Sequence, residues 1–134
     1  MARITVVNDH PDFLELMEEI LEDERHEVTP IDGDLPGALE AIIASRPELL
    51  VIDLRIGTEK LHGWDIAQQI RRQSAFEGLP VVLCSADLLA LGGLEADLSE
   101  TMRTAALAKP FGINELTNLV SVMLGEAAPT SIGG

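Results

Sequence analysis

The chain has 134 residues, of which 46% are hydrophobic, and 23 acidic residues against 9 basic ones give a formal net charge of −14. This length suits one domain of ordinary size and leaves no room for a second. A surface of that sign repels nucleic-acid phosphates and anionic lipids, so we expect no nucleic-acid partner and no membrane partner. Because the chain shows no secretory signal pattern and no apolar stretch of bilayer length, we expect a cytoplasmic protein.

Strand-like and helix-like patterns alternate in the first part of the chain. Ile4 to Val7 is a short apolar run, and Pro11 to Glu24 follows with apolar residues at helical spacing. Glu27 to Ile31 predicts a second strand. We expect the next helix to have Asp34 as its N-cap and Pro36 in its first turn.

The same alternation continues to the end of the chain. Leu49 to Ile52, Val81 to Cys84 and Ala105 to Ala108 are apolar throughout, which is typical of strands covered on both faces. Helical patterns run from Gly63 to Arg72 and from Leu88 to Met102. A last helix has its apolar stripe at Leu116, Leu119, Val120 and Met123.

Five strands alternating with five helices predict an α/β fold, a doubly wound parallel sheet. Right-handed crossovers place helices on both faces of such a sheet. We expect the domain at residues 1–125 and a disordered tail at residues 126–134. The pattern alone leaves the strand order open.

Four of the apolar runs end on polar residues of different chemistry. Asp9 follows the first run, Asp53 the third, Ser85 the fourth and Lys109 the fifth. Ligands of open parallel sheets bind beyond the carboxyl ends of the strands, so we expect these side chains to converge on one pocket. The structural alternative makes Asp9 and Ser85 helix caps and Lys109 a surface loop residue.

Other residues that can carry chemistry have plainer interpretations. The lone cysteine, Cys84, lies within an apolar run, where we expect a small buried hydrophobe. Trp64 is expected to be a packing residue. His10, His26 and His62 lack metal-like spacing, so we expect them on the surface.

The sequence resembles the receiver domains of bacterial two-component response regulators, a flavodoxin-like family with the architecture (βα)5 that includes the stand-alone chemotaxis regulator. The likeness covers residues 3–124. Four segments carry it: Val6-Val7-Asn8-Asp9, Leu50-Val51-Ile52-Asp53-Leu54, Cys84-Ser85-Ala86 and Lys109-Pro110-Phe111. The resemblance implies the strand order 2-1-3-4-5 and a stand-alone, phosphorylatable signalling switch rather than an enzyme.

The resemblance makes Asp53 the phosphoacceptor, which takes a phosphoryl group from a histidine kinase or a histidine phosphotransfer protein. It implies Mg²⁺ as the cofactor, because the charge on the transferring oxygens must be neutralised. The implied metal ligands are Asp9, Asp53 and the main-chain carbonyl of Arg55, with Asn8 contributing weakly through a water.

The resemblance also assigns roles to the remaining polar strand ends. Lys109 contacts the phosphoryl oxygens, and a cis peptide between Lys109 and Pro110 aims it. Ser85 donates its hydroxyl to another phosphoryl oxygen, and its movement begins the signal to a downstream protein.

The chain departs from the family pattern at several positions. Asn8 stands where an acidic residue is usual, which should weaken Mg²⁺ binding, and Ala106 replaces the usual switch aromatic. A degenerate pseudo-receiver, an interaction module that no longer uses phosphorylation, is therefore the main alternative. A hydrolase with Asp53 as nucleophile lacks a second carboxylate as general acid, and flavin binding lacks a phosphate-cradling loop after the first strand.

Overall fold

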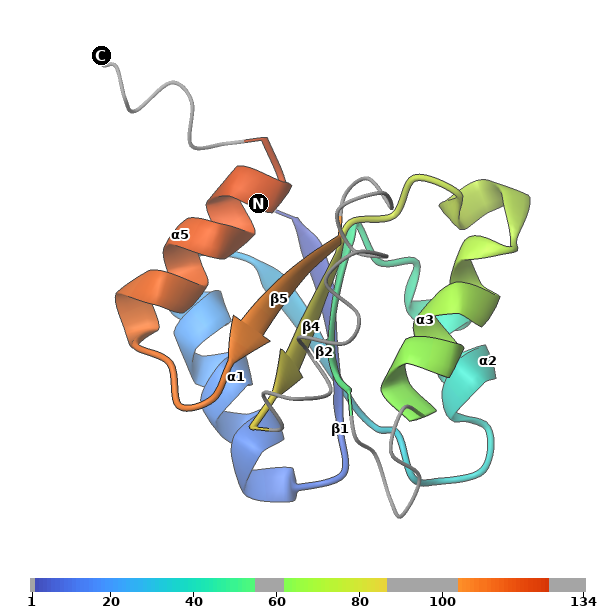
Figure 1. Cartoon of the computed structure of the whole chain (residues 1–134), viewed down its shortest axis with the longest axis horizontal. Coiled ribbons are helices and arrows are strands. Elements are labelled where there is room, and N and C mark those ends of the chain that lie inside the picture. Colours follow the sequence, from blue (N-terminus) through green and yellow to red (C-terminus); the bar gives the residue numbers. More distant parts are fainter. Residues whose placement is uncertain (1, 55–61, 87–103, 126–134) are drawn as a thin grey trace.

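The computed structural model describes residues 2–54, 62–86 and 104–125 (Figure 1). Its five strands form one parallel sheet in the order β2-β1-β3-β4-β5. This is the order that the resemblance implied. The strands are β1 (Arg3–Asn8), β2 (Glu27–Asp32), β3 (Leu49–Asp53), β4 (Val81–Ser85) and β5 (Thr104–Ala108).

Helices cover both faces of the sheet, so the doubly wound α/β prediction is confirmed. Figure 1 shows α1 and α5 against one face and α2 and α3 against the other. The helices of the described ranges are α1 (Pro11–Asp23), α2 (Ala38–Ser45), α3 (His62–Arg71) and α5 (Ile113–Met123), with a short 3₁₀ turn, η1 (Ser74–Phe76).

The two helical layers explain why β3 and β4 are apolar without alternation up to their last residues, Asp53 and Ser85. Every residue of both strands is buried, because each face of the sheet packs against helices. On one face Met17 and Leu21 of α1 and Leu116 and Val120 of α5 are buried in a common core. The predicted apolar stripes of the first and last helices are therefore confirmed.

The predicted start of the second helix is wrong. α2 begins at Ala38, and its N-cap is Gly37, whose φ of 86° lies in the left-handed region that glycine adopts without a Cβ clash. Asp34 instead belongs to the preceding turn, where its N–H donates to Oδ1 of Asp32 at 3.0 Å. Pro36 lies before the helix, not in its first turn.

The surface placement of His26 is also wrong. Its ring is buried, and Nδ1 accepts a hydrogen bond from the backbone N–H of Ala2 at 3.2 Å. The left-handed backbone at Arg25, with φ 70°, comes directly before His26, whose ring lies beside Ala2, the residue that precedes β1. His10 is exposed as predicted, and both Cys84 and Trp64 are core residues as predicted.

Some expectations concern other parts of the chain. The helix expected from Leu88 to Met102, the expected metal ligand Arg55 and the tail at 126–134 all lie outside the described residues. Within the described ranges, no helix combines the length and the apolar character needed to cross a bilayer.

Candidate functional site

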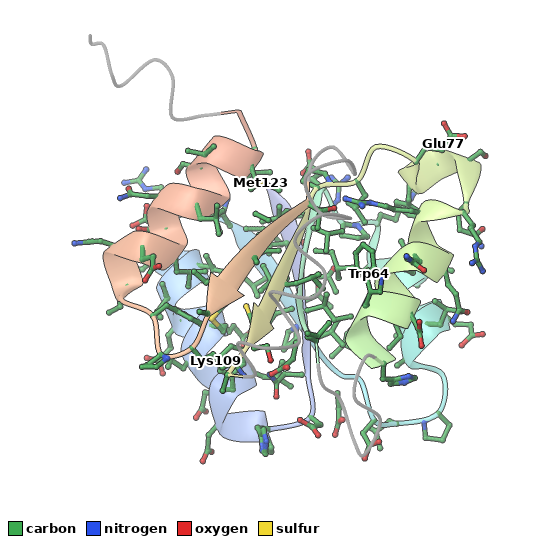
Figure 2. All side chains as sticks on the ribbon, in the orientation of Figure 1. Trp64, Glu77, Lys109 and Met123 are labelled. Carbon is green, nitrogen blue, oxygen red and sulfur yellow. The ribbon has the colours of Figure 1, made fainter. Side chains whose placement is uncertain are left out.

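The carboxyl ends of β1, β3 and β5 bring three polar side chains into contact. Asp53 ends β3 with only 6% of its surface exposed. Its Oδ2 accepts a hydrogen bond from Nζ of Lys109 at 2.5 Å and another from Nδ2 of Asn8 at 2.9 Å. Figure 2 places Lys109 at the end of the sheet to which the strand arrows point, and Glu77 and Met123 at the opposite end.

These contacts make a buried carboxylate tolerable. A charge taken out of water is costly unless it is paired and hydrogen-bonded, and Asp53 has both an ammonium and an amide donor. The side chain of Lys109 is itself only 23% exposed. It is therefore one half of a sheltered ion pair, which excludes the interpretation of Lys109 as a free surface lysine.

Asn8 has a place that the sequence analysis did not foresee. It is completely buried, and its Oδ1 accepts the backbone N–H of His10 at 2.8 Å while Nδ2 donates to Asp53. Both ends of the amide are thus used in direct contacts. An aspartate in this place would lack the donor, so the exchange of acid for amide creates a contact as well as removing a charge.

Asp9 and Ser85 lie at the same edge of the sheet. Oδ1 of Asp9 is 3.6 Å from Nε2 of His10, an ion pair when the imidazole is protonated. The N-cap of α1 is His10, so Asp9 is not the helix cap that the structural alternative required. Ser85 is buried at the end of β4, and its carbonyl accepts the backbone N–H of Lys109 at 2.9 Å.

One aromatic ring lies beside the ammonium group of Lys109, and a second ring packs against the first. Nζ lies 4.4 Å from the centre of the Phe13 ring, and Phe13 meets Phe111 edge to face with 6.3 Å between ring centres. The Lys109–Pro110 peptide bond is cis, as predicted. From the sequence, Phe13 is only one of the apolar residues at helical spacing between Pro11 and Glu24. Its position in the first turn after the β1 edge is the signal that could have placed it near the site.

Gly63 is a second residue that the sequence analysis did not place at the site. A Cβ atom built on it would lie 1.8 Å from the carbonyl oxygen of Asp53. Real atoms never approach so closely, so α3 packs against the end of β3 only because residue 63 has no side chain. Its N–H also donates to the carbonyl of Leu54 at 3.0 Å.

Cys84 lies opposite Asp53 in the pairing of β3 with β4, but its thiol is not reactive. Burial raises the pKa of its thiol from the ordinary 9.0 to about 12; Lys109 lowers this value and Asp53 raises it. The residue is thus a neutral thiol at physiological pH, not a reactive thiolate.

Asp9 and Asp53 bring carboxylate oxygens, the type of ligand that a magnesium ion prefers, to the same edge of the sheet. Mg²⁺ prefers oxygen ligands, keeps several waters and is commonly held by one or two carboxylates. No group of three or more His, Cys, Asp or Glu side chains that could hold a metal occurs in the part of the chain that the structure describes. The main-chain carbonyl of Arg55, the third expected ligand, lies outside those residues.

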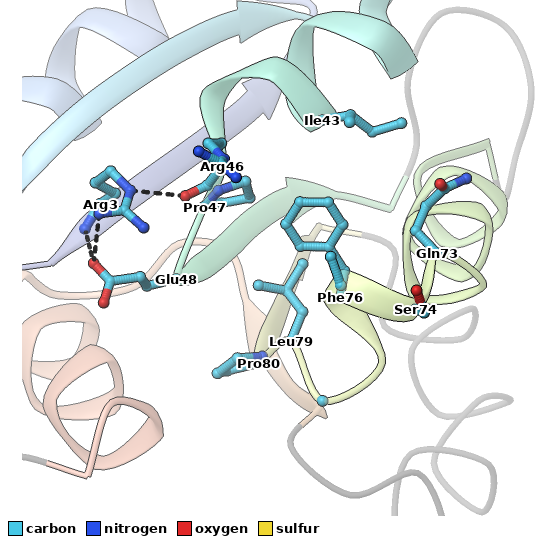
Figure 3. Close-up of a pocket in the computed structure, with 12 residues that line it drawn as sticks. Arg3, Ile43, Arg46, Pro47, Glu48, Gln73, Ser74, Phe76, Leu79 and Pro80 are labelled. Atoms are coloured by element: carbon cyan, nitrogen blue, oxygen red, sulfur yellow. Dashed lines mark hydrogen bonds and ion pairs between the residues drawn. The ribbon is translucent and has the colours of Figure 1, made fainter.

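A hollow of about 740 Å³ lies away from this site (Figure 3). Arg3, Glu48 and Pro80, at the amino ends of three strands, are among the residues that line it. Arg3 donates through its backbone N–H to Glu48 Oε1 at 2.8 Å and through Nε to the Arg46 carbonyl at 2.8 Å. The hollow contains none of the residues around Asp53.

The fold and the residues at its strand ends can be compared with known proteins. Residues 4–121 match the family model of the response regulator receiver domain. The chain belongs to this family, whose members act in two-component signalling and whose general features are phosphorylation and Mg²⁺ binding.

Curated relatives contain this domain within longer chains. The chain is 34% identical over 116 residues to the nitrogen assimilation regulatory protein NtrX of Azorhizobium caulinodans, an alignment that covers 84% of this chain and 24% of that protein. It is 30% identical over 125 residues to the DNA-binding response regulator MtrA of Mycolicibacterium smegmatis, covering 91% and 50%. The chain thus spans from a quarter to half of the length of these relatives.

Solved structures show the same fold. The chemotaxis response regulator CheY4 of Vibrio cholerae superposes with a TM-score of 0.76 at 20% identity, over 92% of this chain and 98% of that one. Another is the receiver domain of the sensor histidine kinase PA1611 of Pseudomonas aeruginosa, with magnesium in its active-site cleft. It gives a TM-score of 0.74 at 24% identity, over 92% and 98% of the two chains. The response regulator TrrA of Thermotoga maritima, solved with Mg²⁺ and BeF, gives 0.73 at 25% identity, over 92% and 99%.

Proposed function

We propose that this chain is a phosphorylatable switch that accepts a phosphoryl group on Asp53 from a histidine kinase or histidine phosphotransfer protein. The observation that supports it is the buried Asp53 carboxylate, paired with Lys109 and hydrogen-bonded to Asn8 at the carboxyl edge of the sheet. A carboxylate prepared in this way is a nucleophile next to a fixed positive charge.

The proposed reaction is the transfer of a phosphoryl group between two side chains. A carboxylate oxygen of Asp53 bonds to phosphorus, while the bond from phosphorus to the donor's imidazole nitrogen breaks and its electron pair stays on that nitrogen. The ammonium group of Lys109 neutralises charge on the phosphoryl oxygens, and the hydroxyl of Ser85 donates to another of them. Mg²⁺, when held by Asp9 and Asp53, supplies further positive charge to the transferring oxygens.

Asn8 sets the charge of the proposed site. Asp9, Asp53 and Lys109 together carry one net negative charge, whereas an aspartate at position 8 would add a second. We infer weaker Mg²⁺ binding than a receiver with an acidic pair would show. We also infer weaker repulsion of the incoming phosphoryl group, because fewer negative charges face it.

The pseudo-receiver remains the second candidate, and Ala106 favours it. This residue lies on β5 with its methyl group exposed, so β5 carries no aromatic ring that could turn inward when Ser85 moves. Its small side chain removes one element of the usual switch but leaves the contacts of Asp53 in place.

We propose that the output is a contact with a downstream protein in the cytoplasm. The net charge of −14 disfavours a direct nucleic-acid contact by this domain. MtrA carries the name of a DNA-binding regulator, but this chain spans only half of its length.

The test is mass spectrometry of the purified chain after incubation with Mg²⁺ and acetyl phosphate. Wild type should gain the mass of one phosphoryl group, and Asp53→Asn should gain none. Asp32→Asn is the matched control, because it makes the same change at the end of β2, which β1 separates from β3, and it should leave phosphorylation intact. A wild-type chain that stays unmodified under conditions that phosphorylate other receivers would support the pseudo-receiver.

A further inference from the structure

The ammonium group of Lys109 contacts a carboxylate and an aromatic ring, and both attract a cation. Nζ is 2.5 Å from Oδ2 of Asp53 and 4.4 Å from the centre of the Phe13 ring. A cation within about 6 Å of a ring centre is attracted by the negative face of the ring. With the side chain of Lys109 mostly buried, water screens this attraction less than at an open surface.

The position of Phe13 is fixed from several sides. It lies in the first turn of α1, where Pro11 takes the first helical position and His10 is the N-cap. The N–H of His10 donates to Oδ1 of Asn8, so the residue that holds Asp53 also holds the start of this helix. Phe111 meets the Phe13 ring at an interplanar angle of 86°, an arrangement in which the positive edge of one ring faces the negative face of another.

We propose that Phe13 is a positioning residue for phosphoryl transfer, which holds the ammonium group of Lys109 in the crevice through the face of its ring. Lysine carries its charge on a flexible stem of four carbons, so something must restrict where that charge lies. The carboxylate of Asp53 serves this purpose only until it becomes an acyl phosphate. The ring of Phe13 is unchanged by the reaction and keeps the ammonium group beside the phosphoryl oxygens throughout.

The plain alternative is that Phe13 only fills the core between α1 and α5, where it packs beside other half-buried apolar residues. Substitution by leucine separates the two explanations, since leucine keeps most of the apolar volume but has no ring. Tyrosine keeps the ring and should rescue the function. Ile20→Val is the matched control, because Ile20 lies on the same helix and against the same core.

The first measurement is an NMR spectrum of the unphosphorylated protein, which is independent of the proposed function. The ring current of Phe13 should shift the ε-methylene protons of Lys109 upfield. Phe13→Leu should remove that shift, while Phe13→Tyr and Ile20→Val should keep it. A Lys109 signal that is the same in Phe13→Leu as in wild type would overturn the proposal.

The second measurement is the rate of phosphorylation by acetyl phosphate at saturating Mg²⁺, and it depends on the proposed function. Phe13→Leu should be about three- to tenfold slower, as expected for the loss of one cation–π contact, with unchanged Mg²⁺ affinity. Phe13→Tyr should restore the rate. A rate equal to wild type in Phe13→Leu, or no rescue by tyrosine, would refute the positioning role.

The two measurements distinguish the possible failures. A wild-type chain that takes no phosphate contradicts the proposed function, and the Lys109 signals then decide the positioning claim by themselves. If Phe13→Leu does not fold, Phe13→Met is the second variant, because methionine is apolar, flexible and without a ring. The same two readouts apply to it.

Discussion

Asn8 is the single residue that most changes the character of this site. Its amide donates to the carboxylate of Asp53 and accepts the N–H of His10, so it links the end of β3 to the start of α1. A carboxylate can accept from His10 but cannot donate to Asp53. Asn8 and Asp53 thus have hydrogen-bond partners within the protein, and the site carries one negative charge fewer than it would with aspartate at position 8.

We predict that Asn8→Asp destabilises the metal-free protein. The variant loses a buried hydrogen bond to a charged group and places two carboxylates together, so its free energy of unfolding should fall by about 2–3 kcal/mol. Mg²⁺ affinity should rise, because the ion relieves the new repulsion. Urea unfolding and a Mg²⁺ titration followed by Trp64 fluorescence measure the two effects.

The control for this prediction is Asn118→Asp, which makes the same chemical change at an exposed position of α5. It should alter neither quantity measurably. An Asn8→Asp variant as stable as wild type without metal would show that the contact with Asp53 contributes little.

The raised pKa of Cys84 predicts that the stability of the fold decreases at alkaline pH. Its folded-state pKa of about 12 lies above the ordinary 9.0, so above pH 9.0 the unfolded chain releases a proton that the folded chain keeps. The stability that this thiol contributes is complete below pH 9.0 and is lost as the pH rises toward about 12, with a limiting slope of about 1.4 kcal/mol per pH unit.

Urea unfolding between about pH 8 and pH 10, a range that includes the ordinary pKa of a thiol, measures how steeply stability falls with pH. The chain has no tyrosine, so few other groups titrate there. Cys84→Ala is the comparison, and it should show a shallower fall in stability with pH. Equal slopes for the two proteins would contradict the raised pKa.

At the scale of elements, the start of α3 lies so close to the end of β3 that residue 63 has no room for a side chain. The Cβ of any residue at position 63 would collide with the carbonyl oxygen of Asp53, which is backbone and cannot turn away. The start of α3 therefore packs directly on the backbone of Asp53, and this packing depends on the absence of a side chain at position 63.

We predict that Gly63→Ala lowers the free energy of unfolding by about 3 kcal/mol or more, because overpacking here displaces backbone rather than a flexible side chain. Thermal or urea unfolding measures the loss. Gly78→Ala is the matched control, since a Cβ at Gly78 meets nothing within 4 Å, and it should be nearly neutral. Similar losses in the two variants would show that the close approach at Gly63 relaxes easily.

At the scale of the whole molecule, the negative charge and the site act together. A net charge of −14 makes the folded chain repel itself, and any salt screens that repulsion. Mg²⁺ should add a specific effect, because a ligand that binds only the folded state stabilises the entire chain. A comparison of Mg²⁺ with another salt at the same ionic strength separates specific binding from general screening.

We predict that MgCl₂ raises the melting temperature of wild type more than NaCl of equal ionic strength. Asp9→Asn should lose this excess, because it removes a carboxylate from the proposed metal site. Glu15→Gln, which removes one charge from an exposed position of α1, should keep it. An excess that survives in Asp9→Asn would indicate that Mg²⁺ binds elsewhere on the acidic surface.

Local sequence patterns determined the element types and the layout of the fold. Runs such as Leu49 to Ile52 of β3 are apolar throughout because burial on both faces leaves no exposed side on which polar residues would alternate. The succession of strands and helices along the chain follows from this signal, whereas the order of the strands within the sheet was implied only by the family resemblance. The edge at which Asp53 and Lys109 meet follows from the parallel arrangement, since residues after parallel strands share one end of the sheet.

Contacts between distant segments needed the tertiary structure. Nothing local to Asn8 indicates that its amide reaches Asp53, and nothing local to Phe13 indicates that its ring faces Lys109. The burial of His26 was wrongly predicted for the same reason, because its contact is with Ala2, far away in the sequence. The start of α2 was wrongly predicted for a local reason, because the left-handed turn at Gly37 delays the helix to Ala38. Sequence patterns report which surfaces are buried along one element, whereas the pairing of side chains depends on how separate elements approach in space.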